Sequence, residues 1–152
     1  MLPLTRYTER MQQPIETQIV NLAKPARPAD PSNPEDLQIA QDLKDTLRAH
    51  SDGCVGMAAN MIGEPVAIIV FVDDEMGGGI TTMLNPRITT AQQYYETAEG
   101  CLSLDGERAV TRAQYIEVDY DNTKGKPRHA RFEGFTAQII QHEVDHCLGK
   151  II

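Results

Sequence analysis

Two stretches of the chain carry apolar residues at the three- and four-residue spacing of an amphipathic helix. The first stretch has apolar residues at Leu37, Ile39, Ala40, Leu43 and Leu47. Asn33 is a favourable helix cap and Pro34 suits the first helical position, whereas the polar, glycine-containing residues 51–53 interrupt the pattern. The pattern therefore predicts a helix from Asn33 to about His50.

The second stretch runs from Phe135 to Lys150 and reads F-T-A-Q-I-I-Q-H-E-V-D-H-C-L-G-K. Thr136 can cap its start, and Gly149 can end it because glycine readily adopts the left-handed conformation that follows many helices. Lys150 adds a cation where the helix dipole is negative. We expect the rest of the chain to pack around this C-terminal helix.

The remaining apolar patterns predict strands. Residues 66–72 (V-A-I-I-V-F-V) are apolar on both faces, which is typical of a strand that is central or covered. Shorter strands are expected at 81–84 (closed by Asn85 and Pro86), 87–91 and 94–98, with a hairpin of 114–120 and 128–133. This order lacks strict βαβ alternation and predicts an α+β fold, with small antiparallel or mixed sheets packed around the C-terminal helix, plus one N-terminal helix.

Length and composition fit one domain. The 152 residues are enough to bury a core, so we expect a single domain over residues 1–152. Residues 1–31 are rich in proline and predict an extended N-terminal arm, held to the core by Ile19, Val20 and Leu22. The net charge of −8, with no basic run, argues against nucleic acid as a partner and against an anionic membrane surface.

The expected compartment is the cytoplasm. The N-terminal residues lack the apolar core of a secretory signal, and no apolar run approaches the roughly 20 residues of a transmembrane helix. Three cysteines, an odd number, without an export signal favour reduced thiols.

Candidate chemistry lies in the second helix, where residues 142–146 read H-E-V-D-H. Imidazoles four residues apart lie on one helix face and can share a metal ion, and the glutamate after the first histidine is placed to act as a general base. Ordinary surface or core histidines are the alternative, but two of the four histidines of the chain fall in these five residues. A metal site here still requires a third ligand from another segment.

Two further segments are ambiguous by themselves. Residues 54–63 (C-V-G-M-A-A-N-M-I-G) suit either a plain strand and bend or a backbone that a ligand approaches closely, because Gly and Ala leave room. Residues 99–103 (E-G-C-L-S) place Cys101 in a polar turn after a glycine. A buried, inert thiol is the default interpretation there, and a thiolate ligand is the alternative.

Together with H-E-V-D-H, these segments resemble the three motifs of the peptide deformylase family, in the same order. E-G-C-L-S and Q-H-E-V-D-H match the second and third motifs, and the C-V-G-M-A-A-N-M-I-G segment aligns with the first, G-Φ-G-Φ-A-A-x-Q-Φ-G, where Φ is apolar. The resemblance implies a metal site formed by Cys101, His142 and His146. It also implies Glu143 as the general base and the backbone N–H of Leu102 as a donor to the oxyanion.

The implied reaction is hydrolysis of the formyl group from N-formylmethionyl peptides of nascent proteins, with transient association with the ribosome. The implied cofactor is one divalent metal ion, Fe²⁺ in the cell. One thiolate and two imidazoles also suit Zn²⁺, and Ni²⁺ or Co²⁺ can use the same ligands, so a preparation can contain Zn²⁺ or Ni²⁺ instead. The sequence ends six residues after His146, and we expect it to lack the C-terminal extension through which some deformylases dock on the ribosome.

The first motif departs from the family pattern at two positions. Cys54 stands where the family has glycine, and Met61 stands where the family has a glutamine that donates a hydrogen bond near the formyl oxygen. Because methionine has no donor, we expect a deformylase with weakened or altered activity, provided that Met61 is not simply a core residue. The alternative is a catalytically silent homologue that binds metal, peptide or a partner. A metalloprotease is disfavoured, because such helices usually recruit His or Glu as the third ligand.

The resemblance places the following residues around the substrate: Val55, Gly56, Met61, Arg108, Phe135, Gln138 and Ile139. Gln138 is polar where the family is mostly apolar, which puts a strict preference for methionine in doubt. Arg108 has an ordinary surface charge as its alternative interpretation. We expect Glu99 and Asp145 to orient the metal ligands.

Overall fold

The computed structural model describes residues 12–73, 77–101, 103–150 and 152. These residues form one five-stranded antiparallel sheet in the order β1-β2-β3-β4-β5. The strands are β1 (Gly56–Ala58), β2 (Ile68–Asp73), β3 (Gly79–Cys101), β4 (Leu104–Asp121) and β5 (Pro127–Glu133). The helices are α2 (Ile19–Leu22), α3 (Pro34–Ala49), the 3₁₀ helix η1 (Ala59–Ile62) and α4 (Gly134–Cys147). The α+β fold is confirmed, although the described strands form a single sheet instead of several small ones.

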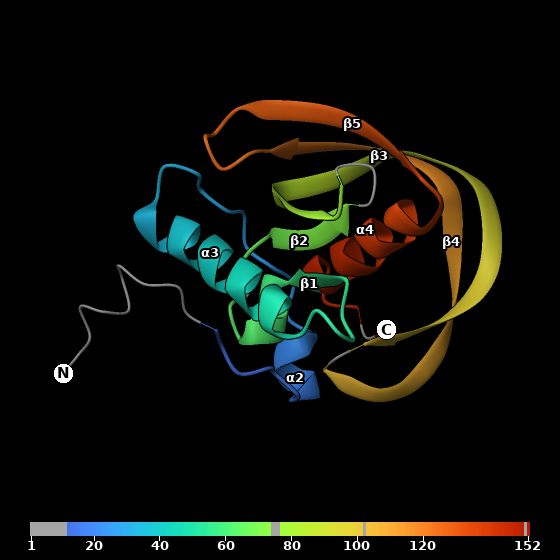
Figure 1. The fold of residues 1–152 in the computed structure, drawn as a ribbon, viewed down its shortest axis with the longest axis horizontal. Coiled ribbons are helices and arrows are strands. Elements are labelled where there is room, and N and C mark those ends of the chain that lie inside the picture. Colours follow the sequence, from blue (N-terminus) through green and yellow to red (C-terminus); the bar gives the residue numbers. More distant parts are fainter. Residues whose placement is uncertain (1–11, 74–76, 102, 151) are drawn as a thin grey trace.

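Strand β2 lies between two helices, and its sequence shows why (Figure 1). Side chains alternate between the two faces of a strand. Ile69 and Phe71 are fully buried in the cluster that contains α4, whereas Ile68 and Val70 are fully buried in the cluster that contains α3. Both faces of β2 are therefore covered, as its unbroken apolar sequence predicts.

Strand β3 corrects one expectation, because the three short strands predicted between residues 81 and 98 are parts of a single strand of 23 residues. Asn85 does not end the strand. It adopts a left-handed φ of 54° at a register shift, which asparagine tolerates better than most residues, and its side chain bonds both backbone groups of Ala29. Beyond this irregularity β3 and β4 pair over most of their length, and both strands curve around α4 (Figure 1).

The two long helices begin in different ways. Asn33 caps α3 as expected, since its side chain accepts a hydrogen bond from the Glu35 N–H. Helix α4 begins two residues before Thr136, which lies inside the helix and is buried. Gly134 has a φ of +61°, and this glycine conformation lets the chain turn directly from β5 into α4. Gly149 follows the helix with a φ of 77°, as its sequence position predicts.

The N-terminal segment is anchored differently from the prediction. Leu22 is fully buried, but Ile19 and Val20 are exposed, because the short helix α2 turns only one face to the core. Arg27 pairs with the buried Asp36 of α3 and forms a bridge with Val66. Among the described residues, no helix has the length and apolar character required to cross a membrane.

Candidate metal centre and active site

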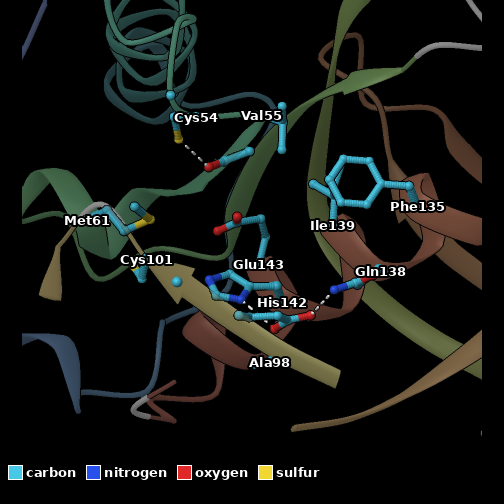
Figure 2. A pocket seen from close by; sticks show the side chains of 14 residues that line it. Cys54, Val55, Met61, Ala98, Cys101, Phe135, Gln138, Ile139, His142 and Glu143 are labelled. Atoms are coloured by element: carbon cyan, nitrogen blue, oxygen red, sulfur yellow. Dashed lines mark hydrogen bonds and ion pairs between the residues drawn. The ribbon is translucent and has the colours of Figure 1, made fainter. Parts of the chain in front are cut away.

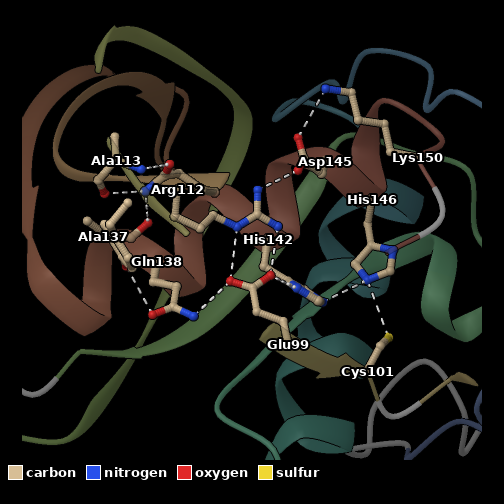
Figure 3. A network of polar contacts seen from close by, with 12 residues as sticks. Glu99, Cys101, Arg112, Ala113, Ala137, Gln138, His142, Asp145, His146 and Lys150 are labelled. Carbon is tan, nitrogen blue, oxygen red and sulfur yellow. Dashed lines mark hydrogen bonds and ion pairs between the residues drawn. The ribbon is translucent and has the colours of Figure 1, made fainter. Parts of the chain in front are cut away.

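The end of β3 and the middle of α4 bring three potential metal ligands together. Cys101 is the last residue of β3, and His142 and His146 lie one turn apart on α4. The two Nε2 atoms of these histidines are 3.1 Å apart, and the Cys101 Sγ is 3.4 Å from the His146 Nε2 (Figure 3). The ligand atoms of all three residues lie within 4.8 Å of one another.

These separations fit a tetrahedral metal site. With metal–nitrogen distances near 2.0–2.1 Å and a metal–sulfur distance near 2.3 Å, a tetrahedron has nitrogen–nitrogen edges of about 3.3 Å and sulfur–nitrogen edges of about 3.6 Å. The observed contacts of 3.1 and 3.4 Å are close to these edges. One thiol and two imidazoles also form a donor set that zinc and several other divalent metals accept. The three residues therefore fit a divalent cation.

Glu99 orients the first histidine of this set. Its Oε1 is 2.8 Å from the His142 Nδ1, so an ionised Glu99 accepts the Nδ1 proton and leaves Nε2 facing Cys101 and His146 (Figure 3). Burial opposes ionisation of Glu99, but hydrogen bonds from His142, Arg112 and Gln138 outweigh it and lower its pKa to about 2. In the metal-free protein, burial disfavours the charged form of His142, yet hydrogen bonds with Cys101 and Glu99 raise its pKa to about 10.

Arg112 is the residue of this network that sequence reasoning missed. Its side chain is 5% exposed and donates to Glu99 through Nε and Nη2 and to Asp145 through Nη1, at 2.9, 2.7 and 2.6 Å. Asp145 thus bonds the arginine and not a histidine. The sequence does contain a signal for it. A buried Glu99 needs a cation as partner, and between the second motif and residue 121 the only basic residues are Arg108 and Arg112.

Glu143 is 3% exposed, and its Oε1 has no hydrogen-bond partner among the residues that the structure describes. Burial raises the pKa of Glu143 to about 7, against the opposing effect of the charge on His142. The carboxylate lies close to the backbone of Gly56. A Cβ atom at Gly56 would be 2.9 Å from the Glu143 Oε2 and 2.6 Å from the Ile139 Cγ2, so only glycine leaves room at this position.

A cavity of about 490 Å³ opens above these residues (Figure 2). Two of the metal-ligand candidates, Cys101 and His142, line it together with Glu143. Its wall also contains six of the seven expected substrate-binding residues: Val55, Gly56, Met61, Phe135, Gln138 and Ile139. The seventh, Arg108, is not in the wall. It lies directly opposite Glu99 across the β3–β4 pair, and its Nη1 is buried without a partner in the described part of the chain. Leu102, whose backbone N–H was expected to act as a donor, lies outside the described residues.

Both departures from the first motif face this cavity. The side chain of Met61 is 1% exposed, and its Sδ accepts a hydrogen bond from the Ala58 N–H at 3.4 Å. The Cys54 thiol donates to the Gly56 carbonyl oxygen at 3.0 Å, and burial raises the pKa of this thiol to about 11. Met61 therefore belongs to a buried apolar cluster and also lines the cavity, where it offers no hydrogen-bond donor.

Comparison with known proteins identifies the family. The family model for polypeptide deformylase matches residues 11–152. A peptide deformylase from Clostridium beijerinckii is 49% identical over 117 residues, which cover 77% of this chain and 84% of that protein. A peptide deformylase from Pelotomaculum thermopropionicum is 37% identical over 114 residues, covering 74% of this chain and 70% of that protein.

Solved structures give the same result. The crystal structure of peptide deformylase from Thermus thermophilus has a TM-score of 0.80 at 34% identity and covers 93% of this chain and 84% of that chain. A class I type b peptide deformylase from Acinetobacter baumannii with Met-Ala-Ser bound has a TM-score of 0.81 at 26% identity, covering 94% of this chain and 97% of that chain. Sequence and fold agree, and the chain belongs to the polypeptide deformylase family of enzymes.

Proposed function

We propose that this protein removes the formyl group from N-formylmethionyl peptides at a metal site formed by Cys101, His142 and His146. The observation that carries the proposal is the buried Oε1 of Glu143, which has no hydrogen-bond partner in the described part of the chain and lies in the same cavity as Cys101 and His142. An unpaired buried oxygen is unfavourable in a purely structural role, so it suits a group that acts on a bound molecule. The relatives named peptide deformylase support the same reaction.

Besides the metal ligands, two glutamates of the site would have separate roles in this reaction. A divalent metal would act as a Lewis acid and make water a better nucleophile at neutral pH. Glu143 would accept a proton from the attacking water through Oε1 and pass it to the leaving amine. Burial raises the pKa of Glu143 in the metal-free protein and so favours the protonated form through which this transfer passes. Glu99 would hold His142 in the tautomer that keeps Nε2 free.

The peptide would bind along β1. In the β1–β2 register, the backbone groups of Val55 and Met57 face β2 and hydrogen-bond to it. The N–H and the carbonyl oxygen of Gly56, between them, therefore point away from β2. No described strand covers that side, which belongs to the cavity. An extended peptide could therefore pair with Gly56 in place of the weak bond from the Cys54 thiol.

We infer that Met61 weakens or alters the deformylase activity. Loss of one oxyanion donor typically lowers kcat by roughly 10²–10³. The metal and the general base remain, so turnover would be slow but not abolished. The family resemblance points to Fe²⁺ as the metal in the cell, and the donor set of one thiol and two imidazoles equally suits Zn²⁺ or Ni²⁺ in a preparation.

Formate release from formyl-Met-Ala-Ser by the Fe²⁺- or Ni²⁺-loaded protein tests the proposal. We expect slow release that disappears in the Glu143→Ala variant, whose metal content and unfolding midpoint are measured to show that it is otherwise intact. A rate equal to that of Glu143→Ala would reject the proposal. Peptide binding without formate release would then favour the alternative, a silent homologue whose Met61 removed the reaction but not the binding.

A further inference from the structure

The cavity has a polar position in its wall that is held in one orientation from both sides. Gln138 lies one turn before His142 on α4, with Phe135 and Ile139 beside it in the wall (Figure 2). Its Nε2 donates to the Glu99 Oε2 at 2.8 Å, and its Oε1 accepts a hydrogen bond from the Tyr95 hydroxyl at 3.1 Å.

The orientation of this amide follows from its partners. Both oxygens of Glu99 accept hydrogen bonds from the Arg112 guanidinium, which can only donate, so Glu99 acts as an acceptor here. The amino group of Gln138 must therefore face Glu99, and the carbonyl oxygen must face the hydroxyl of Tyr95. A primary amide has two N–H donors, and these contacts use one of them. The second N–H is not used by these contacts, and Gln138 is one of the residues that line the cavity.

This wall is where the first side chain of the substrate would lie. The formyl group would sit beside Cys101 and Glu143, and the cavity continues from there to Phe135, Gln138 and Ile139. Phe135 and Ile139 supply apolar surface for an unbranched side chain of methionine length. Gln138 adds to that surface a polar side chain that Glu99 and Tyr95 hold in place, with one N–H that these two contacts do not use.

We propose that Gln138 is a specificity-determining residue that favours a first residue of methionine length carrying a hydrogen-bond acceptor, with Tyr95 as its positioning residue. Methionine sulfoxide is the simplest such side chain, because oxidation keeps the length of methionine and adds a polar oxygen. This inference rests on the proposed function, since it concerns the side-chain pocket of the same substrate.

The test compares two peptides, formyl-Met-Ala-Ser and formyl-Met(O)-Ala-Ser, by calorimetric titration into the Ni²⁺-loaded protein that also carries Glu143→Ala to stop turnover. The measured quantity is the ratio of the two dissociation constants, in which general effects on folding cancel. The Gln138→Leu variant is expected to shift this ratio toward methionine by about five- to hundredfold, because the sulfoxide oxygen is then buried without a partner.

Tyr95 provides a second, independent variant. Tyr95→Phe keeps the ring but releases the Gln138 carbonyl, so we expect a shift in the same direction by about two- to fivefold, within the range of one lost hydrogen bond. Tyr94→Phe is the matched control, because Tyr94 directly precedes Tyr95 in β3 and is 66% exposed. It should leave the ratio unchanged.

The outcomes separate this inference from the proposed function. A ratio that is the same in the parent protein and in Gln138→Leu would overturn the inference, even if the protein with Glu143 intact releases formate from both peptides. The expected shifts without any formate release would support the pocket assignment while rejecting the proposed reaction. If neither peptide binds, the inference is overturned, and the proposed function is rejected as well if the protein with Glu143 intact releases no formate.

Discussion

Arg112 holds Glu99 through two parallel hydrogen bonds, from Nε to Oε2 at 2.9 Å and from Nη2 to Oε1 at 2.7 Å. Both side chains are buried, and the same Glu99 carboxylate contacts His142 and Gln138. One arginine on β4 therefore supports both a metal ligand and the wall of the cavity (Figure 3).

Removing this arginine should destabilise the protein. Arg112→Met removes the buried guanidinium that Glu99 and Asp145 share, leaving Glu99 with His142 and Asp145 with the exposed Lys150. Breaking a buried ion pair in this way typically costs about 3–5 kcal/mol of unfolding free energy. Urea unfolding of the metal-free protein measures the effect. Arg87→Met is the matched control, because the Arg87–Asp119 pair is exposed and should contribute no more than about 1 kcal/mol. Equal losses in the two variants would show that Arg112 has no special role.

Restoring the missing donor should accelerate the reaction. Met61→Gln places an amide in the cavity wall, and we expect formate release to increase by roughly 10²–10³, the effect of one oxyanion donor. Met61→Leu is the control, since it keeps an apolar side chain of similar size and should leave the rate nearly unchanged. An unchanged rate in Met61→Gln would mean that this position does not face the reacting carbonyl.

Gly56 should tolerate no larger residue. In Gly56→Ala the new methyl group would lie 2.6 Å from the Ile139 Cγ2 and 2.9 Å from the Glu143 Oε2, so α4 or the carboxylate must move. Overpacking of this kind costs about 1–3 kcal/mol, and displacement of Glu143 should lower kcat more than it raises KM. Gly53→Ala is the control, because a Cβ there meets no atom within 4 Å. Full activity of Gly56→Ala would place Glu143 elsewhere during catalysis.

His129, on the β4–β5 hairpin, should make the stability of the protein depend on pH. Hydrogen bonds to Asp119 and Glu117 raise the pKa of His129 above its ordinary value of 6.5. A raised pKa in the folded state means that the stabilisation is fully present below pH 6.5 and is lost as the pH rises through the folded-state pKa. NMR titration of the ring should give a value above 6.5 that falls in Asp119→Asn. A value at or below 6.5 would contradict these contacts.

The sequence predicts elements whose signals are local. The α3 boundaries follow from the Asn33 cap and the apolar spacing, and the covered position of β2 follows from its unbroken apolar run. The continuity of β3 was missed because turn-forming residues such as Asn85 also occur at bulges, and only the pairing with β4 distinguishes the two cases.

The same limit applies to the site. The metal-ligand candidates and Glu143 belong to contiguous motifs, so they could be named from the sequence. Arg112 and Tyr95 act through side-chain contacts that span 13 to 43 residues, to Glu99, Asp145 and Gln138. Such contacts depend on the register of β3 and β4 and on how both strands curve around α4, which residue spacing alone does not specify.

The most direct test of the account is X-ray absorption spectroscopy of the protein loaded with one equivalent of Zn²⁺. We predict one sulfur ligand at about 2.3 Å and two imidazole nitrogens at about 2.0–2.1 Å, with the sulfur signal absent in Cys101→Ser and retained in Cys54→Ser. A metal shell without sulfur, or a sulfur signal that survives Cys101→Ser, would contradict the metal site and the chemistry proposed from it.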